Sequence, residues 1–497
     1  MGATFQSRDH LHDHPMSAEP TTDELAGVDA VGLADLIRRG DLSPVEAVQA
    51  TIDRIERLDD RLNAVIHHQF ESALEQAASP ELPAGPFRGV PMLIKDLWAE
   101  EAGQPHHAGV QALKDADLRS TIDSNLVLRY REAGFINVGR TNTPELGLVA
   151  TTEPRSYGPS RNPWSTDHGT GGSSGGAAAA VASGMLPAAN ASDGGGSIRI
   201  PAAMCGLVGL KPSRGRISMG PVKEEWGVSV QHVVCRTMRD CAAILDATAI
   251  PFLGDGVVAP DHGRPYAQRV GTDPGRLRIG LMTHSPRTDV HPDCAAATRR
   301  TGDLLEGLGH DVADTHPQAL EQIDELGWAF NINWGVGAVL SLEHLGGQLG
   351  RPVTGDDVEP GTWMLAERGR GVSATDYAGA QAIMGAFRRT MATWWEDGFD
   401  LLVTPTTALP PPRIDELTPT DDDPLRGSKR SMPYAVFTSP FNTTGQPAIS
   451  LPLGSSDGLP VGVQLVAAYG REDLLMAVGA QLEAEVRWSE QRAPIHA

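Results

Sequence analysis

The sequence predicts an α/β protein, and three observations carry this prediction. Short apolar stretches typical of buried strands alternate with longer stretches of helical spacing along most of the chain. Hydrophobic residues make up 40% of the 497 residues, which is enough for a large core. We find no internal repeat and no linker. One large domain over residues 21–497 is therefore expected, preceded by a flexible polar tail over residues 1–20.

The first half of the chain begins with a well-marked helix. Ser43 is expected to cap it, with Pro44 at the first helical position, Glu46 completing a capping box and helical spacing through Ile66. A short buried strand should follow over residues 92–94, with Lys95 directly after it. The alternation then predicts helices over 121–133, 177–183 and 236–247, with strands over 135–139 and within 207–218.

The second half of the chain continues the alternation. It predicts strands over 277–282, 399–404, 448–453 and 461–466, and helices over 293–308, 375–395 and 472–485. The last two strands flank the turn 455–458 and should form a hairpin. Residues 405–429 are expected to be a proline-rich, acidic surface excursion. Residues 320–372 mix tryptophans with many glycines, and both core packing and a wall over a site stay open for them.

Composition and charge exclude several classes of function. The net charge of −22 at pH 7 disfavours a polyanionic partner, so no nucleic acid is expected. No N-terminal apolar segment and no apolar run of membrane-spanning length is present, and no membrane association is expected. The four cysteines form no CxxC pair, which favours a reducing, cytoplasmic location without disulfides or zinc. We therefore expect neither a metal nor a cofactor.

Two clusters rich in glycine and serine are the candidates for chemistry. The first, GGSSGG over residues 171–176, precedes an alanine-rich run and should feed a helix N-terminus, where free N–H groups favour negative charge. The second, DGGGS, spans residues 193–197. Its consecutive amides are those of Gly194, Gly195, Gly196 and Ser197. These amides fit an oxyanion hole, with the Ser197 hydroxyl beside it as nucleophile.

Lys95 follows three apolar residues at the end of a predicted strand. A lysine in that position ordinarily faces water. If its side chain is buried instead, desolvation lowers its pKa from about 10.4 toward neutrality and makes the amine a usable general base. Such a base needs a neighbouring hydroxyl, and the two serine clusters supply the candidates.

Other interpretations of the serines fit less well. Residues 172–176 satisfy G-x-S-x-G, which would make Ser174 the nucleophile of a strand-to-helix elbow. The preceding residues 165–170 are polar, however, whereas an elbow follows an apolar strand. No glycine is followed by Lys-Ser or Lys-Thr in the pattern of a P-loop. A purely structural glycine-rich turn accounts for one cluster but not for two.

The motifs taken together resemble the amidase signature family. The chain carries GVPMLIKD, TNTPELG, GGSSGG, SDGGGSIRIPA, GLVGLKPSRGRIS and GQPAISLP in that order. Ser173 follows Lys95 by 78 residues and Ser197 follows Ser173 by 24, which also fits the family. Within the family, several stretches look most like 6-aminohexanoate cyclic dimer hydrolases. The resemblance implies the amidase signature fold, a mixed central β-sheet surrounded by α-helices.

The resemblance also implies a serine hydrolase that cleaves carbon–nitrogen bonds through an acyl-enzyme. Ser197 would attack the carbonyl, and Ser173, expected after a cis peptide bond, would relay the proton to neutral Lys95. The carbonyl of Gly147 would contact the substrate. Three further residues would support these loops by hydrogen bonds, namely Ser174, Asp193 and Arg199.

The resemblance implies small-molecule substrates, namely linear or cyclic amides, anilides and carbamates, since relatives include urethane-cleaving enzymes. Trp334 aligns where the nylon-oligomer enzymes present a small cysteine to the substrate, so its indole should contact the substrate and reshape the pocket. Ser192 replaces a frequent threonine before the second cluster. A homodimer is open because dimers are common among the similar enzymes. The alternative function is the amidase-fold glutaminase subunit of a tRNA-dependent amidotransferase.

Overall fold

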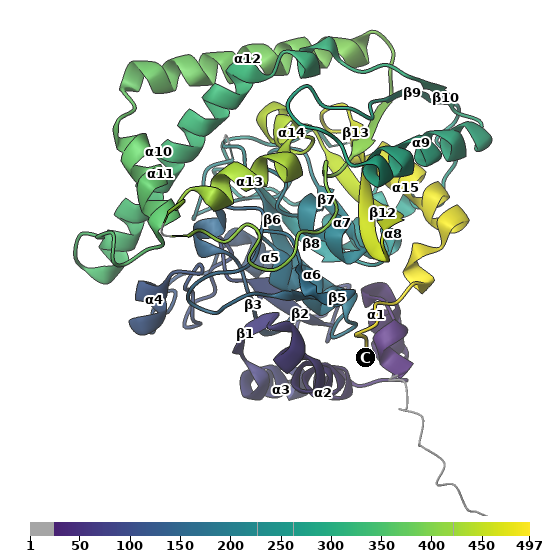
Figure 1. Cartoon of the computed structure of the whole chain (residues 1–497). Coiled ribbons are helices and arrows are strands. Elements are labelled where there is room, and N and C mark those ends of the chain that lie inside the picture. The colour runs from purple at the N-terminus through teal and green to yellow at the C-terminus, as the bar shows by residue number, and fades with distance from the viewer. Residues whose placement is uncertain (1–23, 226, 262, 421) are drawn as a thin grey trace, which may run out of the picture.

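The structure, a computed structural model, describes residues 24–225, 227–261, 263–420 and 422–497. Within these residues the centre of the molecule is a mixed sheet of eleven strands, surrounded by helices (Figure 1). Its order is β1 (Val65–His68), β3 (Ile136–Thr141), β2 (Pro91–Lys95), β6 (Ala188–Asp193), β8 (Val230–Cys235), β7 (Val208–Lys211), β12 (Ala448–Ser456), β13 (Leu459–Ala467), β11 (Leu401–Pro405), β9 (Arg278–Leu281) and β10 (Asp311–Ala313). The predicted mixed α/β architecture is confirmed, whereas the tail predicted over 1–20 lies outside the described residues.

The sheet is mixed because it has parallel pairs toward both ends, while the edge strand β1 pairs antiparallel with β3. β2 runs parallel to β3 and β6, and β9 runs parallel to β10 and β11. The strands between them pair antiparallel, including the predicted hairpin of β12 and β13. A separate two-stranded ribbon consists of β4 (Arg161–Asn162) and β5 (Ser165–Gly169). β2 and β6, which precede the two groups of candidate residues, are therefore neighbours in the sheet.

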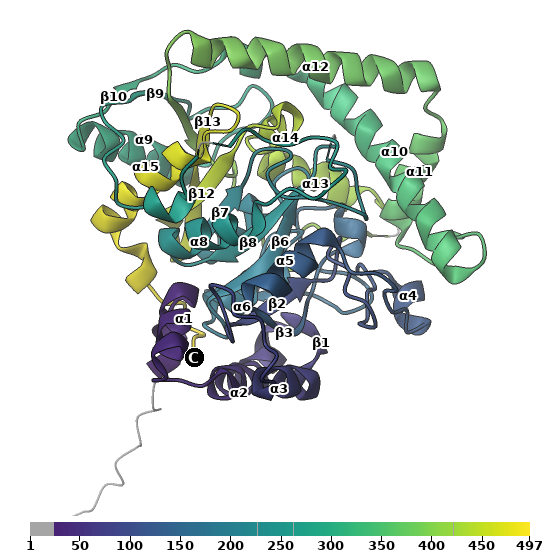
Figure 2. The same ribbon diagram turned by 180° about the vertical axis from the view of Figure 1, so that it is seen from behind.

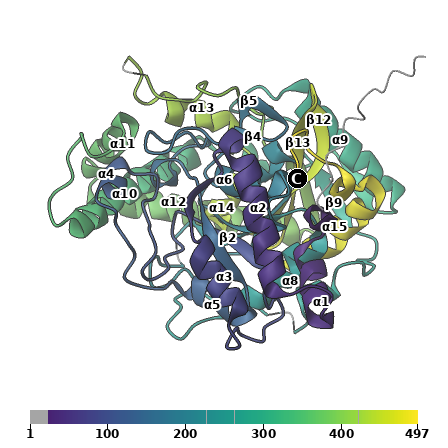
Figure 3. The same cartoon turned by 90° about the horizontal axis from the view of Figure 1, so that it is seen from below.

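Helices pack against the sheet in two large apolar cores. One core takes side chains from α1 (Ala30–Arg39), α5 (Asn125–Ala133), α8 (Met238–Thr248), α9 (Pro292–Gly307) and α15 (Glu472–Val486). The other is built around α2 (Pro44–Leu62), α3 (Phe70–Ala78) and α6 (Gly175–Ala182). Figure 3, the view from below, shows α1, α2 and α3 on the side of the molecule that faces the viewer. In the described part of the chain, no helix combines the length and apolar character needed to cross a membrane.

A third group of helices lies at the opposite side of the molecule from α2 and α3. It comprises α10 (Asp324–Leu349), α11 (Pro360–Arg370) and α12 (Ala374–Glu396), which Figures 1 and 2 show far from α2 and α3. α10 and α11 approach closely at two glycines, because a Cβ on Gly369 would lie 2.2 Å from the carbonyl oxygen of Gly335. The shorter helices α13 (Arg426–Ala435) and α14 (Ser439–Thr444) lie between this group and the sheet (Figure 1).

Most predicted elements are present, and two of them differ in their bounds. The capping box of Ser43 and Glu46 opens α2 as expected, but α2 ends at Leu62 rather than Ile66. The reason is Asn63, which takes a left-handed conformation with φ +50° and ends the helix, so the next residues form β1. Residues 320–372, left open by the sequence, form mostly helix. The excursion predicted over 405–429 ends early, because α13 begins within it.

Candidate active site

Lys95 ends strand β2 and is fully buried. Its Nζ lies 2.8 Å from Ser173 Oγ, 2.9 Å from Ser174 Oγ and 2.9 Å from Ser192 Oγ. Ser192 belongs to β6, the strand that pairs with β2, and the other two serines lie just before α6. The sheet and the N-terminus of α6 therefore surround one buried amine with three hydroxyl groups.

Burial controls the protonation of Lys95. Because removal from water disfavours the ammonium form, burial lowers the pKa of the Lys95 amine well below its ordinary value. The negative charge of Asp193 acts in the opposite direction and raises this pKa, but it is the smaller effect. The environment thus favours the neutral amine, which is the form that a general base requires.

Ser173 is positioned by the loop that precedes α6. The peptide bond between Gly172 and Ser173 is cis, as the resemblance implied. Residue 172 has to be glycine, because a Cβ there would lie 2.4 Å from the carbonyl oxygen of Thr151. Gly147 also lies close, since a Cβ added to it would come within 3.1 Å of Ser173 Oγ. The structure thus places the predicted substrate-contact glycine next to the predicted relay serine.

Ser197 lies between β6 and α7 (Arg199–Cys205) and is only partly buried. It lines a pocket of about 550 Å³, together with Gly147, Gly172 and Gly195. Gly172 directly precedes Ser173 in the chain, and Gly147 lies next to the Ser173 hydroxyl in space. The pocket therefore reaches the predicted nucleophile and the immediate surroundings of the relay serine.

The amides after Asp193 differ in their hydrogen bonds. The N–H of Gly196 donates to Asp193 Oδ1 at 2.7 Å, and the N–H of Ile198 donates to Asp193 Oδ2 at 3.2 Å. In the described part of the chain, the amides of Gly194, Gly195 and Ser197 donate to no other group. Residues 194–198 are here called the oxyanion loop, after the role predicted for them. In this loop the amide of Gly196 is bonded to a carboxylate, and the other three predicted donors remain available.

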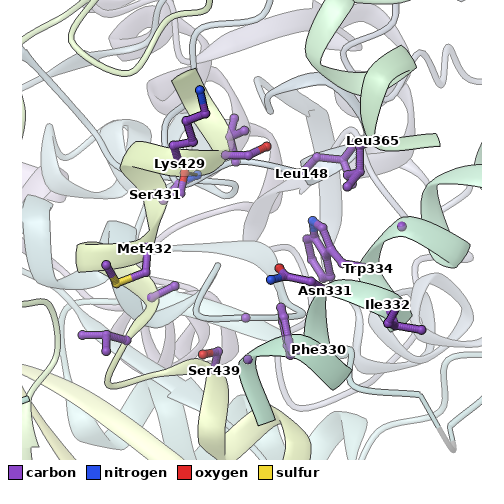
Figure 4. A pocket seen from close by; sticks show the side chains of 18 of the residues that line it. Leu148, Phe330, Asn331, Ile332, Trp334, Leu365, Lys429, Ser431, Met432 and Ser439 are labelled. Atoms are coloured by element: carbon purple, nitrogen blue, oxygen red, sulfur yellow. Dashed lines mark hydrogen bonds between the residues drawn. The ribbon is translucent and has the colours of Figure 1, made fainter. Parts of the chain in front are cut away.

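The walls of the pocket come from helices later in the chain. Phe330, Asn331 and Trp334 of α10 lie on one side, and Ser431 and Met432 of α13 lie on the other (Figure 4). The rings of Phe330 and Trp334 are stacked, with centroids 5.4 Å apart and an angle of 19° between their planes. Trp334 thus lines the pocket at the position where the sequence predicted a substrate contact.

The proteins that are similar to this chain agree with the geometry of the site. A family model described as Amidase matches residues 46–476. The chain belongs to the amidase family. The 6-aminohexanoate-cyclic-dimer hydrolase of Paenarthrobacter ureafaciens is 42% identical over 476 residues, which cover 93% of this chain and 96% of that protein. The enzyme of the same name from Pseudomonas sp. strain NK87 has the same identity and coverage.

Solved structures of amidases superpose over nearly the whole chain. The structure of 6-aminohexanoate cyclic dimer hydrolase gives a TM-score of 0.91 at 42% identity, covering 95% of this chain and 99% of its own. A bacterial aryl acylamidase of the amidase signature family gives 0.86 at 28% identity, covering 96% and 100%. The predicted resemblance to the amidase signature family is thus confirmed.

In this amidase a buried ion pair supports the oxyanion loop. Arg199 donates from Nε to Asp193 Oδ2 and from Nη2 to Asp193 Oδ1, both at 2.9 Å. Asn442 Nδ2 donates to Asp193 Oδ1 at 2.8 Å. Burial alone would raise the pKa of Asp193, but the charge and hydrogen bonds of Arg199 outweigh it and hold this pKa at about 2. The carboxylate is therefore ionised and orients the amides of Gly196 and Ile198.

Three residues of the candidate site make contacts that the sequence analysis did not predict. Ser192 is one of the three hydroxyls around Lys95, although the sequence marked it only as a departure from the family pattern. Thr438 Oγ1 donates to the carbonyl oxygen of Gly195 at 2.6 Å, and Asn442 holds Asp193. Thr438 and Asn442 lie just before the motif GQPAISLP, which is the one signal that could have found them.

Cations, but no acidic, histidine or cysteine side chains, line the pocket of about 550 Å³ in the described part of the amidase. The cations are Arg287, Arg368 and Lys429. One group elsewhere has the donor types and spacing of a metal site, namely His284, His316 and Glu321, with ligand atoms within 4.8 Å of one another. In this structure the two imidazoles instead contact the same oxygen of Glu321, at 2.8 Å and 2.7 Å.

Proposed function

We propose that the chain is a serine hydrolase that cleaves the carbon–nitrogen bond of amides through a Ser197–Ser173–Lys95 triad. One observation carries this proposal: Lys95 Nζ lies 2.8 Å from Ser173 Oγ in a buried site, next to a pocket that Ser197 lines. A buried lysine whose pKa is lowered, in contact with a hydroxyl, is the arrangement that activates a serine nucleophile.

The proton path follows from the donors and acceptors around Lys95. A neutral amine has two N–H donors and one lone pair. The Ser174 hydroxyl donates to the carbonyl oxygen of Ser192 at 3.2 Å, so Ser174 Oγ is an acceptor for Lys95. With Ser192 Oγ accepting the second N–H, the lone pair is left for the Ser173 hydroxyl. Ser173 then passes its proton to Lys95 and takes the proton of Ser197 as Ser197 attacks the carbonyl.

The oxyanion would be stabilised by the amides of Gly194, Gly195 and Ser197. Each well-placed donor of this kind contributes about 3–4 kcal/mol to the transition state. The amide of Gly196, bonded to Asp193, keeps the loop in shape. The leaving nitrogen receives a proton from Lys95 through Ser173, the amine departs, and water hydrolyses the acyl-enzyme to a carboxylic acid by the same relay.

The pocket favours substrates with an apolar body. Phe330, Trp334, Leu365 and Met432 line it, and its volume of about 550 Å³ is in the range of small-molecule sites. We propose linear and cyclic amides and anilides as substrates, with carbamates as a further class because they present the same carbonyl to Ser197. The relatives named as 6-aminohexanoate-cyclic-dimer hydrolases support a cyclic amide as substrate. The indole of Trp334 lines the pocket and limits the shape of the cyclic amide that fits.

The amidotransferase alternative receives less support. A glutamyl-tRNA(Gln) amidotransferase chain from Thermotoga maritima shares the fold, with a TM-score of 0.72 at 24% identity. The hydrolases reach 42% identity over nearly the full length. Glutaminase activity, together with co-purification of partner subunits, would restore the alternative.

The test is release of amine from three substrates, an anilide, the matching aryl carbamate and the cyclic 6-aminohexanoate dimer, measured by mass spectrometry. Ser197→Ala and Lys95→Ala should each abolish amine release. The substrate that the wild type cleaves fastest would identify the substrate class. Ser428→Ala, which alters a different serine of the pocket, should retain activity. Wild-type protein stopped during turnover should carry the acyl mass on the peptide with Ser197. Full activity of Lys95→Ala, or an acyl group on another residue, would refute the triad.

A further inference from the structure

A second cavity of about 150 Å³ lies beside the substrate pocket. This volume equals roughly five molecules of liquid water. Its polar lining consists of Arg214, Asn333, Gln381, Arg388 and Thr443. Thr443 also lines the substrate pocket, so the two spaces share one wall. Arg388 is exposed on α12, which makes this cavity reachable from solvent.

The cavity gathers two positive charges without a counter-charge. Arg214 and Arg388 both line it, and in the described part of the chain neither forms an ion pair with a carboxylate and no acidic residue lines the cavity. The buried arginines Arg199 and Arg216, by contrast, are paired with Asp193 and Glu472. In a protein with a net charge of −22, two guanidinium groups that line one cavity without a carboxylate indicate a site for an anion.

Arg214 is held in place but has a free donor. Its Nη2 donates to the carbonyl oxygens of Asn442 at 2.7 Å and Thr443 at 3.0 Å. Its buried Nε has no hydrogen-bond partner among the described residues. Burial, and after it the positive charge of Arg388, lowers the pKa of Arg214 to about 10, so the guanidinium is still charged at neutral pH. A buried N–H without a partner is costly, and an anionic acceptor that reaches the Nε of Arg214 would remove that cost.

We propose that this cavity binds a small carboxylate between Arg214 and Arg388. The planar guanidinium groups match the two oxygens of a carboxylate. Gln381 Nε2 donates to Asn333 Oδ1 at 3.1 Å, which leaves the amide nitrogen of Asn333 as a further donor for the ligand. The volume suits a carboxylate with a short carbon chain. One source of such a ligand is the acid released by amide hydrolysis next door, a source that depends on the proposed function, and another is any cellular carboxylic acid.

The site would communicate with the oxyanion loop through two contacts. Arg214 binds the carbonyl oxygen of Asn442, and the side chain of Asn442 donates to Asp193, which orients the amides of Gly196 and Ile198. A carboxylate that draws the Arg214 guanidinium into the cavity therefore acts on the residue that holds the Asp193 carboxylate.

Isothermal titration calorimetry of the full chain at low ionic strength tests the proposal without requiring turnover. The probes are acetate, butyrate and 6-aminohexanoate, with chloride and phosphate as anion controls. We expect saturable binding of a carboxylate, weakened at least tenfold by Arg388→Gln. Arg389→Gln, which removes the same charge from the next residue of α12 without lining the cavity, should bind normally. Arg214→Gln, checked for folding by circular dichroism, should bind as weakly as Arg388→Gln.

Several outcomes would overturn this assignment. Binding that survives Arg388→Gln but is lost in Arg368→Gln would place the carboxylate in the substrate pocket instead. Equal affinity for chloride or phosphate would show a general anion site and not a carboxylate site. Absence of saturable binding by the wild type would also refute the proposal. Because the measurement is binding, its result is independent of whether Ser197 is the nucleophile, and a preference for the acid product over acetate would distinguish the two sources.

Discussion

The indole ring of Trp334 lies over Gly194, where the oxyanion loop begins. A Cβ added to Gly194 would be 3.3 Å from both Cζ3 and Cη2 of this ring. Phe330 stacks on the indole and fixes its position. The bulk of Trp334 thus limits the space above one of the amides that would bind the oxyanion, and the substrate must fit beside it.

Trp334→Cys should shift selectivity toward bulky amides. Removing the indole widens the pocket next to Gly194, and a misfit of even one methylene in an apolar pocket changes selectivity about tenfold or more. We expect the ratio of kcat/KM for the cyclic 6-aminohexanoate dimer to that for acetanilide to rise at least about tenfold. Trp328→Cys is the control, because Trp328 lines the same pocket but is 46% exposed. An equal shift in both variants, or a falling ratio, would contradict the role of Trp334.

The pH dependence of turnover should report the state of Lys95. The active form is the neutral amine, and burial lowers its pKa. Therefore kcat/KM should rise with pH and reach its plateau below the ordinary lysine pKa of about 10.4. Lys95→Met should reduce kcat by about 10²–10⁴-fold, the usual contribution of a general base. A plateau reached only near pH 10.4 would show that the lysine is not desolvated during catalysis.

The same group links stability to pH with a definite sign. Below the unfolded pKa of lysine, the unfolded chain binds a proton that folded Lys95 does not bind, so the free energy of unfolding rises with pH. This rise should extend from the lowered folded pKa up to about 10.4 and should be smaller in Lys95→Met, as measured by urea unfolding. Lys114→Met, on the surface helix α4 (Gln111–Asp115), should keep the wild-type slope. Identical slopes in all three proteins would contradict a neutral Lys95.

Gly147→Ala should lower kcat by more than its loss of stability can explain. The new Cβ would lie 2.6 Å from Leu97 Cδ2 and 3.1 Å from Ser173 Oγ, and a displacement of about 1 Å in a catalytic group can cost about 10²-fold in rate. The matched control is Gly40→Ala at the end of α1. Gly40 has a similar φ of +78° but nothing within 4 Å of the added Cβ. Gly40→Ala should lower the melting temperature and leave kcat unchanged, and equal kcat values for both variants would refute the crowding at Ser173.

Asp193→Asn should destabilise the protein strongly. It leaves the guanidinium of Arg199 buried without its carboxylate, and breaking a buried pair in this way costs about 3–5 kcal/mol. Because the pKa of Asp193 is about 2, the stabilisation in the wild type is complete above the unfolded pKa of about 3.9 and is lost as the pH falls toward 2. Urea unfolding measures both effects. Asp35→Asn, which breaks an exposed pair with Arg38, should change stability little, and a similar loss in both variants would contradict the argument.

The reacting groups could be predicted from the sequence, because they lie in motifs of unusual composition. Lys95, Ser173 and Ser197 were each marked by a local pattern, and the sheet brings β2 and β6 together as the motifs require. The occupied amide of Gly196 could not be foreseen, because it depends on where the Asp193 side chain turns. Thr438 and Asn442 act from more than 240 residues away in sequence, so no local pattern shows their contacts with this loop.

The helices that wall the pocket were harder to predict for a different physical reason. α10 buries apolar residues against α11 and α12 and also faces the pocket, so it shows no single apolar stripe. Gly335 and Gly369 look like turn signals in the sequence, but the structure uses their missing side chains to let two helices touch. Close packing at glycines and a helix that is apolar on several faces both weaken the periodic signal on which sequence prediction depends.

The proposed catalytic groups and most of the side chains that line the pocket come from different stretches of the chain. The proposed catalytic groups lie between Lys95 and Ser197, whereas the helical walls lie between α10 and α14. Mutations in the second stretch can alter which compounds are admitted without disturbing the first. After gene duplication, changes in a few helices can therefore give such an enzyme a new substrate range while its catalytic mechanism stays the same.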